Sequence, residues 1–253
     1  MKKLVAILGI ITIICIFLGT YIHVGGFFMD GGNLFGSSIF SFGSKGKQVT
    51  FNEDYSGVEK LDINMAVGDV VIEQGSTFNV DFKGHEDLLP EVTLKDNKLS
   101  IKQKKDIKLR PTNLNNLKSN LTVTVPSSVT LKELEADLDM GDLDISEVAC
   151  GKLKADLSMG NLEINDVEAE KIEADNDMGD CKIYNAKFDD LTADCDMGNL
   201  KLKLTDSSDN YGIHAKCDMG NVTIDGDDEG NNYSSSGDKT ISLKVAMGNI
   251  DVN

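Results

Sequence analysis

A short repeated segment constrains the fold of this chain more than any other feature. The stretch ADLDMGDLDI (Ala136–Ile145) is followed by cognates in which a Met-Gly pair again precedes Asp or Asn. Successive Met-Gly pairs lie 19, 19, 19, 22 and 28 residues apart. An earlier copy, LDINMAVGDVVIE (Leu61–Glu73), keeps Gly-Asp and has Val67 in place of Met. Copies spaced so regularly predict a repeat architecture.

Each copy alternates apolar and polar residues before its Met-Gly pair. Ala136 and Leu138, for example, are separated by acidic residues. This period of two is typical of a half-buried β-strand. From Met140 to Leu143 the apolar positions take an odd step, so a straight strand would turn Leu143 toward water. The chain must therefore bend between them, and Met140, in phase with Leu138, is expected to fill the core.

Glycine and a following Asp or Asn suit such a bend. Glycine reaches positive φ without a steric penalty, and a short Asp or Asn side chain bonds nearby backbone groups. A second odd step, from Ile145 to Val148, predicts a second corner in each repeat. The first corners are predicted at Gly68, Asp69, Gly141, Asp142, Gly160, Asn161, Gly179, Asp180, Gly198, Asn199, Gly220, Asn221, Gly248 and Asn249.

Two strands and two corners in about 19 residues make one coil of a β-solenoid. Coils of this kind pair through parallel ladders, and stacking buries apolar faces that a lone coil leaves exposed. The sequence therefore predicts an all-β protein, a parallel β-solenoid over residues 49–253. We expect an irregular N-terminal part at 49–133 and regular repeats at 134–253.

The N-terminal segment predicts a transmembrane helix. The uncharged run from Leu4 to Ile22 is long enough to span a hydrocarbon core of about 30 Å. Lys2 and Lys3 precede it, which favours a single-pass, N-in orientation in the cell membrane with an extracytoplasmic C-terminal domain. We expect a retained anchor at residues 1–24, with a cleaved signal peptide as the alternative. The Gly-, Ser- and Phe-rich residues 25–48 are predicted to be a tether.

The charge of the chain excludes one class of partner. The formal net charge is −17 at pH 7, and residues 1–50 contribute +3, so residues 51–253 carry −20. Proteins bind phosphate backbones through basic clusters that release counterions. We therefore expect no binding to nucleic acid.

Outward-facing carboxylates are expected to form two columns on the first strand of each coil. Like charges on strands about 4.8 Å apart repel each other, so cations would ease the contact, and oxygen-only ligands suit Ca²⁺. The alternative, which we favour, is a solvated acidic face, because sparse exposed carboxylates bind Ca²⁺ weakly. The columns are Asp137, Asp156, Asp175 and Asp194, and Asp139, Asp177, Asp196 and Asp218, the second interrupted by Ser158.

No catalytic constellation is visible in the sequence. The three histidines, His23, His85 and His214, are far apart along the chain, and no nucleophile elbow, Walker loop or zinc motif occurs. Cys195 and Cys217 are expected in one inward column, one coil apart, where a disulfide is conceivable but small core residues are the better interpretation. We therefore expect neither enzymatic activity nor a cofactor.

The pattern resembles a known bacterial family. The segments LDINMAVGDVVIE and LTVTVPSSVTLKELEADLDMGDLDI, with the recurring Gly-Asp/Asn-apolar-x-apolar motif, are similar to the putative-adhesin domain of unknown function, a β-strand-repeat family. The resemblance covers about residues 49–253, and the preceding anchor resembles the LiaG-type members. The family usually has Ser or Ala before its Gly, so the Met here is a departure. The resemblance supplies no catalytic residues.

These features imply a membrane-anchored, non-catalytic binding or scaffold module of the cell envelope. Cell-wall glycan and envelope proteins are the expected partners. One alternative, implied by the LiaG-type resemblance, is an accessory protein in envelope-stress signalling. Another is self-association, because the last corner at Gly248-Asn249 lies close to Asn253 and predicts an open solenoid end that can pair with a second copy.

Overall fold

The computed structural model describes residues 47–104 and 118–253. Residues 45–253 form one compact unit. The described part is all-β, with two short 3₁₀ turns, η1 (Glu86–Leu88) and η3 (Ser208–Asn210). The predicted anchor at 1–24 and nearly all of the tether at 25–48 lie outside the described residues. Over the described ranges, no helix has the length and apolar character needed to cross a membrane.

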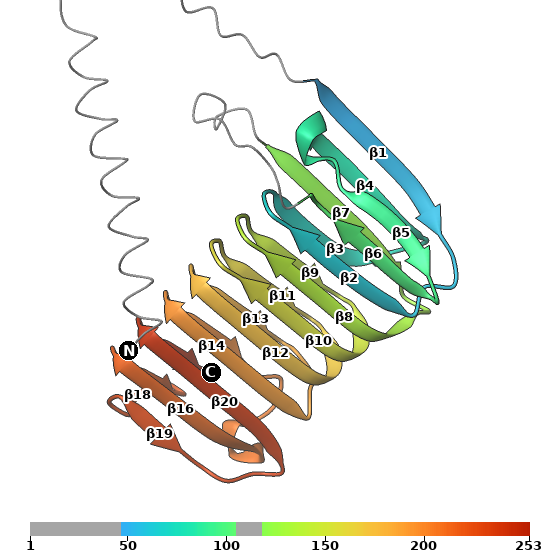
Figure 1. Cartoon of the computed structure of the whole chain (residues 1–253). Coiled ribbons are helices and arrows are strands. Elements are labelled where there is room, and N and C mark those ends of the chain that lie inside the picture. Colours follow the sequence, from blue (N-terminus) through green and yellow to red (C-terminus); the bar gives the residue numbers. More distant parts are fainter. Residues whose placement is uncertain (1–46, 105–117) are drawn as a thin grey trace, which may run out of the picture. The chain divides into compact units, whose positions relative to one another are not determined.

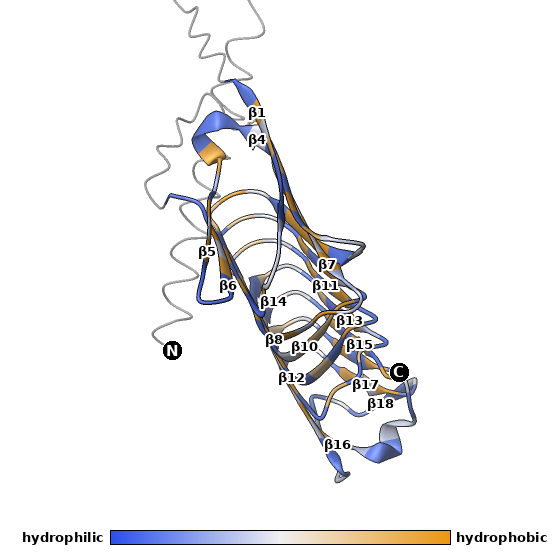
Figure 2. Ribbon diagram, turned by 90° about the vertical axis from the view of Figure 1, so that its right-hand side faces the viewer, coloured by the Kyte–Doolittle hydropathy of each residue, from blue (hydrophilic) through white to orange (hydrophobic). Residues whose placement is uncertain are grey.

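Two sheets pack face to face, and Figure 2 shows them as two layers. Sheet A contains, in spatial order, β1 (Gln48–Tyr55), β4 (Phe78–His85), β7 (Ser119–Pro126), β3 (Asp69–Gly75), β9 (Leu143–Ser146), β11 (Leu162–Asn165), β13 (Cys181–Tyr184), β15 (Leu200–Lys203), β21 (Ile250–Val252), β17 (Val222–Ile224) and β18 (Asp227–Asp228). Sheet B contains β19 (Asn232–Ser234), β16 (Tyr211–Met219), β20 (Lys239–Met247), β14 (Asp190–Met197), β12 (Glu168–Met178), β10 (Ala149–Leu157), β8 (Thr130–Leu138), β2 (Lys60–Met65), β6 (Lys98–Lys102) and β5 (Glu91–Lys95).

Each regular coil gives one long strand to sheet B and one short strand to sheet A. In sheet B, Ala149 pairs in parallel with Thr130 on one side and Glu168 on the other, an offset of one repeat. In sheet A, Leu162 pairs in parallel with Leu143 and Cys181. Stacked parallel coils of 19 residues are therefore present, as predicted for the regular repeats.

The early copy of the repeat is a full member of the stack. Its strands β2 and β3 pair in parallel with β8 and β9, and the Gly68 amide donates to the Met140 carbonyl at 2.9 Å. Antiparallel strands close the ends of the sheets: β1, β4 and β5 at one end, and β18 and β19 at the other. The parallel stack predicted from the sequence is therefore present, and antiparallel strands at its ends, which the sequence did not predict, make both sheets mixed.

The last coil in sequence is an inner coil in space. Strand β20 pairs in parallel with β14 on one side and β16 on the other (Figure 1). Strand β21 lies between β15 and β17. The outermost coil is β16–β17, and β19 and β18 cover its free edges. The expectation of an open end at Gly248-Asn249 was therefore wrong. The long connection from Asp225 to Lys239 leads the chain past β16–β17, and the following strands β20 and β21 then insert between that coil and β14–β15.

Stacked aliphatic side chains form the core between the sheets. One inward column of sheet B is fully buried from coil to coil, and each such Leu or Ile contributes about 1.5–3 kcal/mol on burial. Because this burial is shared between neighbouring coils, the stability of each coil depends on the next. The column consists of Leu134, Leu153, Ile172, Leu191, Ile241 and Ile213.

The methionines before the glycines are not core residues, contrary to the prediction. Met140 is 43% exposed and Met219 is 61% exposed, and none of the other four is fully buried. The core ends two residues earlier, at buried positions such as Leu138 and Leu157. Strands β8 and β10 stop two residues before the methionine, and β12, β14, β16 and β20 end on it. Each methionine thus lies at the start of the bend and at the edge of the core, where strand alternation no longer fixes which side the residue faces.

Glycine is required at the first corner for two reasons. All seven corner glycines have φ between +137° and +151°. In addition, a Cβ at Gly160 would overlap the carbonyl oxygen of Gly141 in the preceding coil, and the same overlap recurs at Gly179 and Gly198. The second corner is also confirmed, with positive φ at Glu147, Asp166 and Asn185.

We expect Gly160→Ala to destabilise the protein by at least about 3 kcal/mol, since steric overlap adds to backbone strain. Gly57→Ala is the matched control, because Gly57 also has positive φ (73°) but no atom lies near its Cβ position. The control should cost about 1 kcal/mol. Urea unfolding of both full-length variants measures the difference, and equal losses would contradict the stacking argument.

Candidate functional site

A continuous column of aspartates runs across sheet B on its outward face. Asp156 is in register with Asp137 and Asp175, and Asp175 with Asp194, so four carboxylates occupy neighbouring strands. At one end, the Asn64 side chain donates to Asp137 at 2.9 Å. At the other end, the Lys244 Nζ lies 3.7 Å from Asp194. We call these four aspartates the acidic column.

The second predicted column is interrupted twice. Ser158 stands between Asp139 and Asp177, as the sequence shows. Asp196 and Asp218 are not neighbours, because the inserted strand β20 places Ala246 between them. The structure therefore brings Asp177 and Asp196 together beside the acidic column and leaves Asp218 apart.

Charge crowding is greatest at the centre of this face. Burial, followed by the negative charges of Asp156, Asp177, Asp194 and Asp196, raises the pKa of Asp175 above its ordinary value of 3.8. The acidic column is therefore a region of concentrated negative potential.

Glu173 lies two residues before Asp175 in strand β12, and lysines on its own and the neighbouring strand balance its negative charge. Glu173 lies 2.9 Å from Lys152 and 3.0 Å from Lys171, and hydrogen bonds to these lysines lower its pKa. Sheet B thus presents an ion-paired strip beside the acidic column.

The two carboxylates should respond oppositely to neutralisation. Asp175→Asn should raise the free energy of unfolding at pH 7 by roughly 0.5 kcal/mol, because like charges across strands repel. The folded-state pKa of Asp175 lies above its unfolded value, so the penalty of the charged form disappears as pH falls through this interval toward 3.8. The gain of the variant should disappear over the same range.

Glu173→Gln is the matched control in the same strand. Its pKa is lowered by folding, so its contribution is present above its ordinary value of 4.5 and is lost as pH falls through the folded-state pKa. Urea unfolding as a function of pH should therefore show a loss of roughly 0.5 kcal/mol at pH 7. A destabilised Asp175→Asn would show that crowding does not dominate at the acidic column.

The carboxylates are aligned but do not converge. Among residues 47–104 and 118–253, no three His, Cys, Asp or Glu side chains are grouped so that they could hold a metal ion. The hollow of about 160 Å³ beside Asp194, Asp196 and Asp218 also contains Lys216 and Lys244. The two ammonium groups oppose a cation there, so the geometry offers little to the Ca²⁺ site that we considered as the weaker interpretation of the sequence.

A second ladder of side chains follows the first corners. The Asn161 amide and side chain both donate to Asp142 Oδ1, at 2.7 and 3.1 Å. The Asp180 amide donates to Asn161 Oδ1 at 3.1 Å, and Asn199 donates in turn to Asp180 Oδ1 from its amide at 2.9 Å. The Asp or Asn after each Gly thus links one coil to the next, rather than closing its own turn as predicted.

Buried polar side chains complete the inner side of these corners. Asn176, fully buried in an otherwise apolar column, donates to the Gly160 and Asp180 carbonyls at 3.2 and 3.3 Å. One coil on, the Cys195 thiol donates to the Gly179 carbonyl at 3.4 Å. Because Val245 separates Cys195 from Cys217, the two are not neighbours, and the described cysteines are free thiols.

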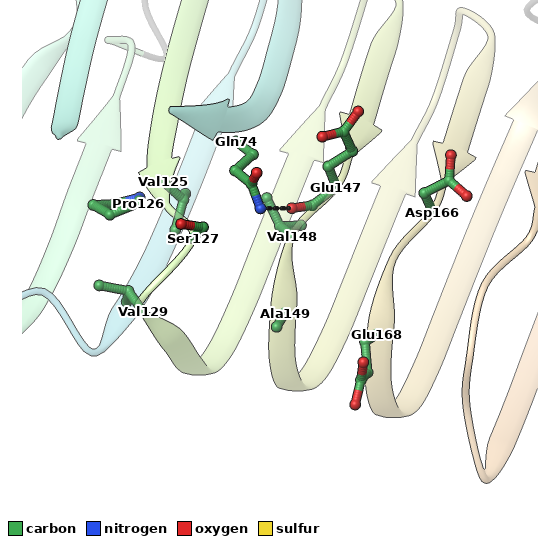
Figure 3. Close-up of a pocket in the computed structure, with 10 residues that line it drawn as sticks. All are labelled: Gln74, Val125, Pro126, Ser127, Val129, Glu147, Val148, Ala149, Asp166 and Glu168. Atoms are coloured by element: carbon green, nitrogen blue, oxygen red, sulfur yellow. Dashed lines mark hydrogen bonds between the residues drawn. The ribbon is translucent and has the colours of Figure 1, made fainter. Parts of the chain in front are cut away.

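The second corners line a shallow groove that the sequence did not predict (Figure 3). Its volume is about 310 Å³, and its walls include Val129, Val148 and the carboxylates of Asp166 and Glu168. The Gln74 side chain donates to the Glu147 carbonyl at 3.3 Å across this region. The lining contains no histidine, lysine or cysteine, and its one hydroxyl side chain belongs to Ser127. The odd step from Ile145 to Val148 predicted the second corners, and this was the only sequence signal for the groove that they line.

The two described histidines lie at opposite ends of the stack. His85 ends β4, where its Nδ1 accepts from the Asp87 amide at 3.2 Å, and it is buried. His214 is in β16, with its Nδ1 2.9 Å from Ser234 Oγ. Neither forms a constellation with the acidic column, and His23 lies outside the described residues.

The stacked two-sheet architecture matches a known family. The model of the Toastrack DUF4097 family matches residues 58–253. The chain belongs to this family. No match was found among curated proteins.

Solved structures resemble this chain at low sequence identity. A putative cell adhesion protein from Clostridium sporogenes is 18% identical, with a TM-score of 0.51, over 82% of this chain and 99% of that one. A putative adhesin from Bacteroides fragilis is 17% identical, with a TM-score of 0.46, over 82% and 97%. A putative lipid binding protein from Parabacteroides distasonis is 16% identical, with a TM-score of 0.41, over 83% and 98%.

Proposed function

We propose that this toastrack protein is a non-catalytic binding module of the cell envelope and that the acidic column is its contact surface. The single observation that carries the proposal is the in-register placement of Asp137, Asp156, Asp175 and Asp194 on four adjacent strands. Like charges in this arrangement repel, and burial together with the neighbouring carboxylates raises the pKa of Asp175 at its centre. Packing of the core does not require these four aspartates, so we assign the destabilising row of like charges to recognition of a partner.

A basic protein surface is the partner that fits this column. Complementary charge steers encounter and fixes the register of a complex, and the strands of sheet B hold the four carboxylates at regular spacing. The binding role is in line with the name of the Clostridium sporogenes protein of similar fold, a putative cell adhesion protein. The described residues offer a long ordered face and shallow hollows, which suit a macromolecule better than an enclosed small ligand.

The binding test uses the full chain in a nonionic detergent as bait for envelope proteins and cell-wall glycan. Replacing all four aspartates of the acidic column with asparagine should abolish capture of basic envelope proteins. Capture by the unmodified chain should also weaken as salt is raised above 0.1 M, where the Debye length is about 10 Å.

The matched control removes four charges from the other sheet. Glu73→Gln, Asp144→Asn, Glu163→Gln and Asp251→Asn lie on sheet A and change the net charge equally. This variant should retain capture. If both variants lost capture of basic envelope proteins equally, net charge alone would explain the effect. If the chain captured glycan and neither variant changed that capture, the acidic column would not be the contact surface.

Residues 1–24 are proposed to anchor the module in the cell membrane, with the toastrack domain outside. The proposal rests on the uncharged run from Leu4 to Ile22 and the preceding Lys2 and Lys3. An epitope placed after Asn253 should be accessible to antibody on intact cells and remain in the membrane fraction. Release of the epitope into the medium would indicate cleavage, and labelling only after lysis would reverse the orientation.

A further inference from the structure

Six of the nine methionines stand on one line along the first corners. The corner ladder is continuous, because the amides of six of the seven corner glycines donate to the carbonyl of the methionine in the next coil at 2.9–3.0 Å, and the seventh, Gly220, lies in the outermost coil. Strand pairing places Met197 opposite both Met178 and Met247, and Met247 opposite Met219. We call this row the methionine ladder. In spatial order it contains Met140, Met159, Met178, Met197, Met247 and Met219.

Neither the core nor the corner requires methionine at these positions. The side chains are partly to largely exposed, and the two ends of the ladder, Met140 and Met219, are the most exposed. The first coil makes the same corner with Val67, whose neighbour Gly68 forms the same amide-to-carbonyl bond. Six thioethers at a solvent-accessible edge therefore call for an explanation in the chemistry of sulfur.

Thioethers are soft, neutral ligands that select soft metal ions such as Cu(I). Adjacent coils hold their methionines about 4.8 Å apart at the backbone. The zinc–thiolate bond is about 2.3 Å long, and two collinear metal–sulfur bonds of similar length would span about 4.6 Å, which is close to this spacing. Methionine also has three rotatable bonds, so each sulfur can adjust to an ion between the coils.

The surroundings favour a cation and limit the competing ligands. The residue before each ladder methionine is a carboxylate in four coils, among them Asp177 and Asp196. The thiols nearest in sequence, Cys195 and Cys217, are buried in the core. Thioethers are thus the accessible sulfur ligands at this edge.

We propose that the methionine ladder binds soft monovalent metal ions of the cuprous class, each held between the thioether sulfurs of adjacent coils. The carboxylates beside the ladder attract the cation, and the sulfurs provide the selectivity. The site is independent of the acidic column proposed above to bind a protein partner.

Silver(I), added as silver nitrate in chloride-free buffer, is the redox-inert probe for this site. The full chain, labelled with ¹³C at the methionine methyl groups, is titrated in a nonionic detergent. We expect the signals of the ladder methionines to shift while that of Met65 stays in place, because Met65 is buried in β2. Shifts confined to Met1, Met29 or Met65 would overturn the proposal.

Leucine substitutions identify the ligands with little change in volume. Met197→Leu combined with Met247→Leu removes an adjacent pair, and it should remove at least one equivalent of silver or weaken binding at least about tenfold. Met65→Leu is the matched control and should bind like the unmodified chain. Unchanged binding after replacement of all six ladder methionines would overturn the proposal.

The pH dependence separates thioethers from other ligands. A thioether does not take up a proton in this range, so silver affinity should be the same at pH 5 and pH 7 within about twofold. Histidine and thiolate ligands must lose a proton to bind, so their affinity would fall steeply on acidification. A steep fall would assign the silver to those groups and refute the ladder site.

Discussion

The close stacking of one corner glycine on the next sets the register of the whole molecule. At Gly160 the α-carbon approaches the Gly141 carbonyl so closely that no side chain fits, and the same contact recurs from coil to coil. With this point fixed, the strands on either side must pair residue for residue. The aliphatic column around Leu153 and the amide ladder from Asp142 to Asn199 both follow from that register.

An in-register stack multiplies the effect of each side chain, whether favourable or unfavourable. Leucine on leucine shares burial, and asparagine on aspartate donates two hydrogen bonds, so these columns gain from repetition. Stacked aspartates destabilise each other, and burial followed by the neighbouring carboxylates raises the pKa of Asp175. The acidic column is therefore the part of the pattern that the fold tolerates rather than needs, which is why we assign it to recognition.

Much of the coil could be predicted from the sequence because its signals are local. The odd step from Met140 to Leu143 located the first corner, and glycine at that step indicated positive φ. The exposure of Met140 was missed because alternation assumes a straight strand, and the strand ends at Leu138. The close approach of the Gly141 carbonyl to Gly160 was not predictable, since Gly141 belongs to a different coil. The four aspartates of the acidic column could be predicted from their positions in the repeat. The separation of Asp196 from Asp218 could not, because spacing along the chain does not reveal which coils are neighbours in space.

The insertion of β20 and β21 has a consequence for how the molecule is assembled. Strands β16 and β17 leave the ribosome before the coil that must separate them from β14 and β15. Their final partners β20 and β21 are made after them, and these long-range pairings must wait until then. Losing the final strands would not trim the stack at one end, as it would in a linear solenoid. Loss of β20 and β21 would instead leave a gap inside the stack, between β14–β15 and β16–β17. The toastrack is therefore completed by a coil that inserts between two coils made earlier.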